Sequence, residues 1–182
     1  MLPDTNKVHT VVFDFDGVFT DNKVIIDEHG KESVVCDRAD GLAFDFVRKL
    51  QRKGSLKTKF FILSKETNPV VLSRAKNMKI ECYSGVNNKK VFLEEYLQSS
   101  FDDIDSAREG LIYVGNDLND IPAILYAGFS VAPCDAHPRV IDSVSLVLSK
   151  KGGQGFVRFF IEVFLGFDKL SMEDLNEFIL NS

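Results

Sequence analysis

The chain has 182 residues, of which 45% are hydrophobic and 27% are charged, and its formal net charge at pH 7 is -5. This length and apolar content suffice for one core, so we expect a single domain over residues 1–182. An acidic chain lacks the basic face that nucleic-acid binding needs, and no apolar run approaches the roughly 18 residues of a membrane span, so neither nucleic acid nor a membrane is an expected partner.

Apolar runs with the length of buried strands alternate along the chain with amphipathic segments of helical periodicity. The strands are predicted at residues 8–15, 59–63, 111–114, 129–132 and 145–148. The helices are predicted at residues 42–50, 69–77, 89–97, 121–127 and 155–165. Such alternation is typical of right-handed βαβ units, so the expected fold class is α/β, a Rossmann-like arrangement with a central parallel sheet and helices on both faces.

Residues 23–36 interrupt this alternation. Two short β-like runs flank a turn that contains Gly30, which predicts a β-hairpin flap directly after the first strand. Such a flap would project over the end of that strand. Because an isolated two-stranded ribbon is only marginally stable in water, we expect it to pack against another subunit.

The last segment, residues 166–182, is predicted to form a C-terminal tail helix. Its apolar residues recur at helical spacing, which is more typical of packing than of catalysis. The members of this apolar stripe are Leu170, Met172, Leu175, Phe178 and Ile179.

The three cysteines are widely spaced, with no C-x-x-C pair and no histidine at ligand spacing. This pattern predicts neither a disulfide framework nor a zinc site, and it suits a reducing compartment. Residues 1–9 are polar and lack the apolar core of a signal peptide. We therefore expect a cytoplasmic protein.

Two acids, Asp14 and Asp16, stand at the end of the first predicted strand. An isolated D-x-D pair is commonly a solvated turn or a helix N-cap. Here apolar residues surround the pair, which favours a buried central strand whose carboxyl end lies where open α/β sheets bind ligands. Neighbouring buried anions repel unless a cation compensates them, so a divalent metal is expected, and Gly17 lets the backbone turn there.

Further polar groups follow other predicted strands. Ser64 closes the run at 59–63, Lys89 opens a helix, and Asp117 and Asp120 follow the run at 111–114. A hydroxyl, a cation and several acids at one sheet edge are the groups that phosphoryl transfer uses. Each also has an ordinary explanation: Ser64 as a helix N-cap, Lys89 as a solvated surface lysine, and the two aspartates as helix caps.

The order of these motifs resembles the haloacid dehalogenase superfamily of aspartate-nucleophile phosphatases. D-x-D-G-x-x-T-D from Asp14, then Ser64, Lys89 and G-N-D-x-x-D from Gly115 occur in the family's order, and the resemblance runs from about Val8 to Leu165. It implies this family's fold. The hairpin, the small size without a large cap domain, Asp40-Gly41 and the late G-G-Q-G-F-V-R segment resemble one branch. That branch contains phosphatases of 3-deoxy-D-manno-octulosonate 8-phosphate and of nonulosonate 9-phosphates, and the domain fused to some sialic acid cytidylyltransferases.

The residues themselves suggest the chemistry. Asp14 would attack phosphorus and form an aspartyl-phosphate, and Asp16 would protonate the leaving oxygen and later activate water. Mg²⁺ would screen the anionic nucleophile from the phosphate. Ser64 would hydrogen-bond a phosphoryl oxygen, and Lys89 would neutralise charge that develops in the transition state.

The metal site departs from the family's pattern. The family commonly has an acid directly after the glycine of the last motif, whereas this chain has Asn116, followed by Asp117. A carboxamide oxygen ligates Mg²⁺ without contributing charge, so we expect either a lower metal affinity or a ligand role for Asp117. The candidate metal ligands are therefore Asp14, Asp16, Asn116 and Asp117.

By resemblance, the substrate-binding residues are Thr20, Asp40, Glu66, Arg74, Asp120 and Arg158. The octulosonate phosphatases tend to carry Arg where this chain has Glu66, whereas the nonulosonate phosphatases have Glu with a downstream Arg that matches Arg74. Arg74 would pair with the sugar carboxylate. The alternatives are that Glu66 and Arg74 are surface charges and that Arg158 braces its own helix.

The expected function is that of a Mg²⁺-dependent phosphatase of a phosphorylated 2-keto-3-deoxy sugar acid, with a nonulosonate 9-phosphate as the leading candidate. One alternative is the octulosonate 8-phosphate. Another is a weakly active or non-catalytic module that supports a cytidylyltransferase assembly, which Asn116 favours and the intact acids oppose. The resemblance also implies a homotetramer in which the C-terminal segment reaches toward a neighbouring subunit's site.

Overall fold

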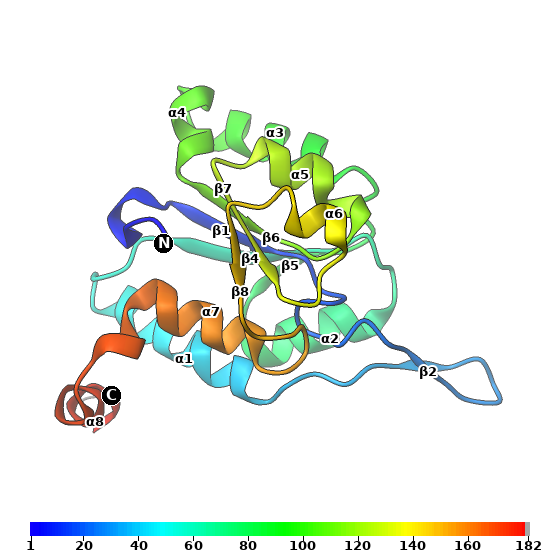
Figure 1. The fold of residues 1–182 in the computed structure, drawn as a ribbon, viewed down its shortest axis with the longest axis horizontal. Coiled ribbons are helices and arrows are strands. Elements are labelled where there is room, and N and C mark those ends of the chain that lie inside the picture. Colours follow the sequence, from blue (N-terminus) through cyan, green and yellow to red (C-terminus); the bar gives the residue numbers. More distant parts are fainter. Residues whose placement is uncertain (181–182) are drawn as a thin grey trace.

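The core of the molecule is a six-stranded parallel sheet in the order β5-β4-β1-β6-β7-β8, with helices on both faces (Figure 1). The computed structural model describes residues 1–180. The strands are β1 (Thr10–Phe13), β4 (Lys59–Leu63), β5 (Glu81–Tyr83), β6 (Leu111–Val114), β7 (Phe129–Pro133) and β8 (Leu146–Leu148). This arrangement confirms the predicted α/β class. No helix within residues 1–180 is long and apolar enough to span a membrane.

The helices form two layers, one on each side of the sheet (Figure 1). One layer consists of α1 (Ala39–Arg52), α2 (Pro69–Met78) and α7 (Phe156–Leu165). The other consists of α3 (Lys89–Ser100), α4 (Ile104–Glu109), α5 (Ile121–Tyr126) and α6 (Pro138–Ile141), and short 3-10 turns occur at η1 (Thr5–Lys7), η2 (Leu118–Asp120) and η3 (Phe167–Lys169). Because side chains alternate along a strand, β1 supplies Val11 and Phe13 to the first layer and Val12 to the second.

Phenylalanines dominate the packing beneath α1 and α7. The Phe13 ring meets Phe44 and Phe160 edge to face, with centroids 6.1 and 5.5 Å apart. Such pairs add about 0.5–1.5 kcal/mol each beyond the burial of their area. Phe15 and Phe19 complete the cluster from the loop after β1, and both are fully buried. The loop that carries the first acidic motif is therefore anchored in the core.

The sequence prediction was wrong about where the first strand ends and missed three elements. β1 stops at Phe13, because the chain turns there and the Phe19 N–H donates to the Phe15 carbonyl at 2.8 Å. Phe15 thus reaches the core from a turn, which an apolar pattern cannot distinguish from a strand. The missed elements are β5, α4 and α6, which have only three, six and four residues and therefore give little periodic signal.

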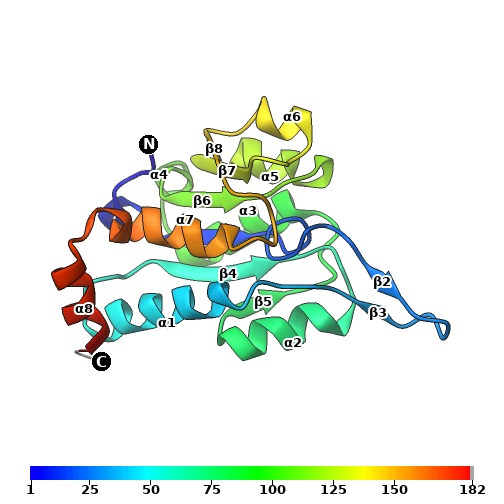
Figure 2. The same cartoon turned by 60° about the horizontal axis from the view of Figure 1, so that its bottom comes forward.

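The predicted hairpin at 23–36 is present but shorter than expected. It pairs β2 (Ile25–Ile26) with β3 (Glu32–Ser33), and Gly30 has a φ of +75° in its turn. Figure 2 shows the hairpin extending away from the body of the molecule. The side chain of Asn68, the N-cap residue of α2, donates to Glu32 on β3 at 3.1 Å. This hydrogen bond connects the hairpin to the start of α2.

The C-terminal tail folds back on its own chain. Beyond η3, α8 (Met172–Leu180) places the Phe178 ring 5.5 Å from Phe46 and 4.8 Å from Phe167, and the Lys49 ammonium lies 4.3 Å from the Phe178 centroid. The tail therefore packs on the chain mainly through Phe178, whereas Leu170, Met172 and Ile179 of the predicted apolar stripe are exposed. Residues 181–182 of the predicted range lie outside the described residues. Figure 2 shows α8 at the opposite end of the molecule from the hairpin.

Candidate active site

The carboxyl ends of the three central strands enclose a polar pocket of about 350 Å³. Strand β1 lies between β4 and β6, so the loops that follow these strands converge on one point of the sheet edge. The residues that line the pocket are Asp14, Asp16, Asn22, Ser64, Lys65, Glu66, Asn116, Asp117 and Asn119. The topology therefore brings the predicted acids, hydroxyl and amide together.

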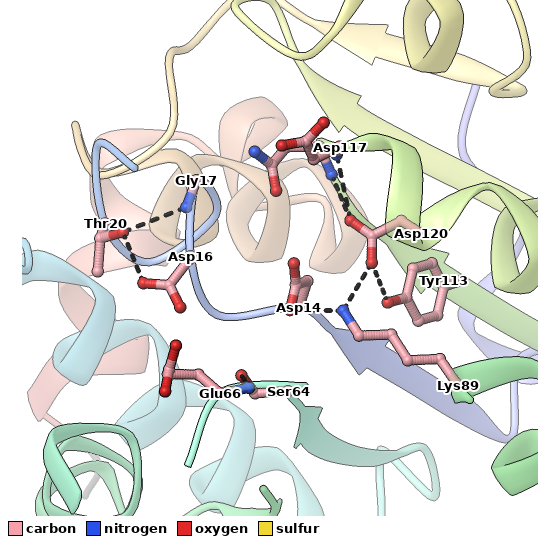
Figure 3. Close-up of polar contacts among 11 residues, drawn as sticks. Asp14, Asp16, Gly17, Thr20, Ser64, Glu66, Lys89, Tyr113, Asp117 and Asp120 are labelled. Carbon is pink, nitrogen blue, oxygen red and sulfur yellow. Dashed lines mark hydrogen bonds and ion pairs between the residues drawn. The ribbon is translucent and has the colours of Figure 1, made fainter. Parts of the chain in front are cut away.

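Lys89 connects this pocket to a buried polar network (Figure 3). Its ammonium lies 2.7 Å from Asp14 Oδ1 and 2.7 Å from Asp120 Oδ1. The Tyr113 hydroxyl donates to the same Asp120 oxygen at 2.7 Å. Lys89 is 3% exposed, which rules out the alternative of a solvated surface lysine. One cation is thus shared by two carboxylates away from water.

Burial and the charge of Asp120 raise the pKa of Asp14 to about 7, although Lys89 acts in the opposite direction. At neutral pH a carboxyl with this pKa is only partly ionised. A divalent cation beside it would favour the carboxylate. The environment of Asp14 therefore suits a bound metal.

A tight turn holds Asp16 opposite Glu66 (Figure 3). Burial raises the pKa of Asp16, and the charge of Glu66 adds to this effect. The Thr20 hydroxyl donates to Asp16 at 3.4 Å and accepts the Gly17 N–H at 3.2 Å. Thr20 is fully buried and does not line the pocket, so its observed contacts shape the loop.

Two features of the structure favour glycine at position 17. Its φ of +75° is in the left-handed region, and a Cβ at this position would lie 1.9 Å from Asn116 Nδ2. The amide side chain of Asn116 thus packs directly on the turn that follows Asp14 and Asp16. This contact links the first and last motifs of the chain.

Asn116 offers the best-oriented neutral ligand for a cation. Its Oδ1 is one of three buried side-chain atoms in the described residues that have no hydrogen-bond partner. Asp14, Asp16 and Asn116 all line the pocket, and hard oxygen donors suit Mg²⁺. Within residues 1–180 no group of three or more Asp, Glu, His or Cys side chains is arranged to hold a metal.

The two acids after Asn116 form a capping box. Asp117 Oδ1 accepts the Leu118 N–H at 2.7 Å, and Asp120 Oδ2 accepts the N–H groups of Asn116 and Asp117 at 2.9 and 3.2 Å. The capping alternative for both acids is therefore correct. Asp117 still lines the pocket, whereas Asp120 is fully buried and contacts Lys89.

Ser64 is oriented by the loop after β4 and is 1% exposed. Its Oγ accepts the Glu66 N–H at 3.0 Å, which leaves the hydroxyl proton available for a ligand. The N-cap of α2 is Asn68, whose side chain accepts the Val70 N–H at 3.1 Å. The alternative that Ser64 caps this helix is wrong.

Of the six predicted substrate-binding residues, only Glu66 lines the pocket; besides Thr20 and Asp120, three more lie elsewhere. Asp40 is fully buried on α1 and accepts the Arg158 N–H at 2.9 Å. Arg74 donates to the Asp37 carbonyl at 2.7 Å. The Arg158 guanidinium pairs with Glu162 and lies 5.4 Å from the Phe46 centroid, so the helix-bracing alternative describes its contacts in this structure.

The sequence argument missed Tyr113, Asn22 and Asn119. Tyr113 lies in the middle of β6 and is fully buried. A tyrosine within a short apolar run requires a partner for its hydroxyl, and that requirement could have indicated a buried acceptor. Asn22 and Asn119 reach the pocket only through the loop geometry, for which the sequence carries no signal.

A larger cavity of about 630 Å³ lies at the opposite edge of the sheet, beside Lys7, His9 and Gly110. His9 there is already satisfied, because its ring nitrogens contact the Thr10 hydroxyl at 2.8 Å and the Ala107 carbonyl at 2.6 Å. That cavity contains no paired, buried acids. The smaller pocket at the carboxyl edge carries the reactive groups.

Comparison with known proteins relates this site to one family. Residues 42–160 match the haloacid dehalogenase-like hydrolase family. Among curated proteins, the 3-deoxy-D-manno-octulosonate 8-phosphate phosphatase of Escherichia coli is 26% identical over 159 residues, which are 87% of this chain and 79% of that protein. A HAD family hydrolase from Streptomyces avermitilis is similar in structure, with a TM-score of 0.79 and 36% identity over 91% of this chain and 96% of its own. The cobalt-bound deoxy-D-mannose-octulosonate 8-phosphate phosphatase of Haemophilus influenzae gives a TM-score of 0.75 and 26% identity over 89% and 90% of the two chains.

Proposed function

Because the chain belongs to the haloacid dehalogenase-like hydrolase family, we propose that it is a Mg²⁺-dependent phosphomonoesterase that acts on a phosphorylated 2-keto-3-deoxy sugar acid. The observation that carries this proposal is the contact of Lys89 with Asp14, 2.7 Å apart at the edge of a pocket that also contains Asp16 and Ser64. A buried nucleophile, a buried cation and a free hydroxyl proton are what the transfer of a phosphoryl group requires.

In the first step a carboxylate oxygen of Asp14 attacks phosphorus, and the bond between phosphorus and the sugar oxygen breaks. The product on the protein is an aspartyl-phosphate. Asp16 donates its proton to the departing sugar oxygen, a role that its raised pKa supports. Lys89 and the Ser64 hydroxyl contact the phosphoryl oxygens, where negative charge accumulates in the transition state.

In the second step water attacks the phosphorus of the aspartyl-phosphate. The Asp16 carboxylate takes a proton from this water, and the bond between phosphorus and the Asp14 oxygen breaks. Inorganic phosphate leaves and both carboxyl groups return to their starting protonation states. Splitting the hydrolysis in this way replaces one difficult displacement with two easier ones.

The cation is assigned to oxygens of Asp14, Asp16 and Asn116, with Asp117 as the other candidate ligand. Bound Mg²⁺ would supply positive charge beside the nucleophile and the phosphoryl group. The unpartnered Oδ1 of Asn116 supports this assignment, whereas Asp117 Oδ1 already accepts a backbone N–H.

We assign the leaving sugar to the groove between the hairpin and the start of α2, which continues from the pocket through Glu66 and measures about 820 Å³. Glu66 Oε1 accepts the N–H groups of Thr67 and Asn68 at 2.7 and 3.1 Å, so backbone contacts hold its carboxylate in place. A fixed acceptor suits the hydroxyl and amide groups of a nonulosonate 9-phosphate. Arg74 would have to leave the Asp37 carbonyl to reach the sugar carboxylate.

The second candidate substrate is 3-deoxy-D-manno-octulosonate 8-phosphate. The names of the relatives from Escherichia coli and Haemophilus influenzae favour it. We keep Thr20, Asp40, Asp120 and Arg158 as proposed substrate-supporting residues, which act through the loops that they hold. A homotetramer and a cytoplasmic location complete the proposal, and the three unpaired cysteines suit a reducing compartment.

A substrate panel tests the proposal. Purified protein with Mg²⁺ is expected to release phosphate from a nonulosonate 9-phosphate faster than from the octulosonate 8-phosphate, measured as kcat/KM for each ester. Asp14→Asn should lower kcat by about a thousandfold or more, because a carboxamide does not attack phosphorus. The reverse preference would establish the second candidate. If neither ester nor a small aryl phosphate is hydrolysed, the protein is the non-catalytic module.

A further inference from the structure

The amide of Asn116 lines the pocket at the position where the family commonly has an acid. Asn116 is 6% exposed, and its Oδ1 has no hydrogen-bond partner although it borders the pocket with Asp14 and Asp16. A buried acceptor without a donor costs free energy unless something in the pocket completes it. A cation does so, and the neutral amide adds no negative charge to the site.

The effect of the neutral Asn116 amide depends on the charged side chains around the pocket. Asp14, Asp16 and Asp120 carry three negative charges when ionised, and Lys89 carries one positive charge in contact with two of them. Asp14 and Asp120 are buried, whereas Asp16 is only partly buried, as is Asp117. Lys65 and Glu66 also border the pocket, but they are exposed, so water screens them more strongly. The acids therefore outnumber the lysines around the pocket.

We infer that Asn116 makes the binding of the cation and of the phosphoryl group mutually dependent. This inference rests on the proposed phosphatase function of the same pocket. With a neutral third ligand, the protein alone holds the cation weakly, and the phosphoryl oxygens supply the missing anionic ligands. An acid at residue 116 would hold the cation more firmly but add one negative charge facing the incoming phosphate dianion.

The two ligands should therefore respond to an added charge in opposite directions. Asn116→Asp keeps the shape of the side chain and adds one negative charge. We expect Mg²⁺ alone to bind this variant on the order of tenfold more tightly, because the charge count of the ligands tunes the affinity for such cations. Inorganic phosphate at saturating Mg²⁺ should bind on the order of tenfold more weakly, because a like charge faces it.

Two further variants separate ligation from long-range charge. Asn119→Asp adds the same charge at an exposed position that borders the same pocket, and it should change both affinities by less than about threefold because water screens it. Asn116→Ala removes the oxygen without changing the charge, so it should weaken the binding of Mg²⁺ and of Mg²⁺-dependent phosphate together. Of the three variants, only Asn116→Asp should raise the affinity for Mg²⁺ and lower the affinity for phosphate.

Isothermal titration calorimetry tests this with the full-length protein, Mg²⁺ and inorganic phosphate, and circular dichroism checks that each variant is folded. In the unmodified protein, saturating phosphate should tighten Mg²⁺ binding, and Mg²⁺ should tighten phosphate binding by the same factor, since such coupling is reciprocal. Phosphate binding that does not depend on Mg²⁺, or an Asn116→Asp variant with unchanged affinity for Mg²⁺, would overturn the inference. Because these titrations need no turnover, a protein that hydrolyses no ester but shows the coupling would refute the proposed function and leave the inference standing.

Discussion

Lys89 is the residue on which the electrostatics of the site depend. Its ammonium is the only positive group in contact with Asp14 and Asp120 among the ion pairs of residues 1–180, and all three side chains are buried. Taking these charges out of water costs several kcal/mol for each ion, and the short contacts offset only part of this cost, since the pKa of Asp14 is still raised to about 7. Losing the cation would leave two carboxylates without compensation.

The variant Lys89→Met tests this balance. We expect it to lose about 3–5 kcal/mol of unfolding free energy at pH 7, because a broken buried ion pair leaves uncompensated charge. It should also lose phosphate release. Urea unfolding measures the first effect and a phosphate assay the second. Lys90→Met is the matched control, because Lys90 pairs with Glu94 at 3.3 Å on the surface and should cost less than about 1 kcal/mol.

Asp40 predicts a pH dependence of stability. Burial raises its pKa to about 7, so between about pH 4 and pH 7 the folded protein holds a proton that the unfolded chain has released. Stability from this group therefore falls as the pH rises through that window. Asp40→Asn keeps an oxygen for the Arg158 N–H and removes the ionisation. At pH 8 the free energy of unfolding of this variant should exceed that of the natural protein by about 2 kcal/mol, and the difference should shrink toward pH 4.

Urea unfolding at several pH values measures this difference. A gain of the same size at pH 4 and pH 8 would show that the side-chain shape, and not the ionisation of Asp40, is responsible. If Asp40→Asn and the natural protein had the same free energy of unfolding at every pH, the proton held by the folded protein would belong to another group. Either result would remove Asp40 as the titrating group.

At this scale the sequence predicted which strand-end side chains gather at the pocket better than it predicted their contacts. Asp14, Asp16, Ser64 and Asn116 all border the pocket, because each follows a strand and the carboxyl ends of parallel strands share one edge. The contact of Asp120 with Lys89 spans 31 positions of the chain and depends on how α3 meets the loop after β6. No local pattern encodes such a distance.

Among the elements, the glycine-rich turn before α7 supports the catalytic loop. A Cβ on Gly152 would lie 2.0 Å from the Gly17 carbonyl oxygen and 3.1 Å from that of Thr20. Both contacts are with backbone, which cannot rotate away as a side chain can. The turn and the loop that carries Asp16 are therefore packed against each other.

Replacing Gly152 should disturb both segments. Gly152→Ala is expected to lower the unfolding free energy by about 1–3 kcal/mol, the usual range for overpacking, and to reduce kcat more than KM because Asp16 moves with its loop. Gly41→Ala is the matched control. Nothing lies within 4 Å of its Cβ on helix α1, so it should raise stability by up to about 1 kcal/mol. Thermal unfolding and steady-state kinetics distinguish the two variants, and equal behaviour would contradict the packing argument.

The long helices were predictable from periodicity, whereas the short elements β5, α4 and α6 were missed. Helices α1, α2, α3 and α7 have ten residues or more, which gives the apolar pattern room to repeat. Strand β5 has three residues that are half-buried or exposed at the sheet edge. Its pairing with β4 makes it a strand, and that pairing is a tertiary contact.

At the scale of the whole molecule, the hairpin extends beyond the domain and presents apolar side chains to solvent. Val24, Ile25, Ile26 and Val35 are 53–63% exposed. Apolar groups gathered on a projecting ribbon commonly mark an interface with another protein. This surface supports the expected homotetramer, which remains a prediction.

A double variant tests the hairpin as a subunit interface. Ile25→Asp combined with Ile26→Asp should shift the mass measured by light scattering from that of a tetramer to that of a smaller species, because charge there opposes apolar contact between copies. Leu125→Asp is the control, since Leu125 is 66% exposed on α5, away from the hairpin. A mass that the double variant leaves unchanged would exclude the hairpin from the interface.

By itself, the sequence determined the α/β class, the acidic end of the first strand and the polar groups that follow other strands, because the alternation of strands and helices is visible in local patterns. The tertiary structure decided which of those groups face the pocket. Asp40, Asp120 and Arg158 are all charged, yet helix packing gives each one a partner within the protein. A charged residue that is paired in the fold and one that awaits a ligand look alike in a sequence, and only the packing of the helices and loops around each one distinguishes them.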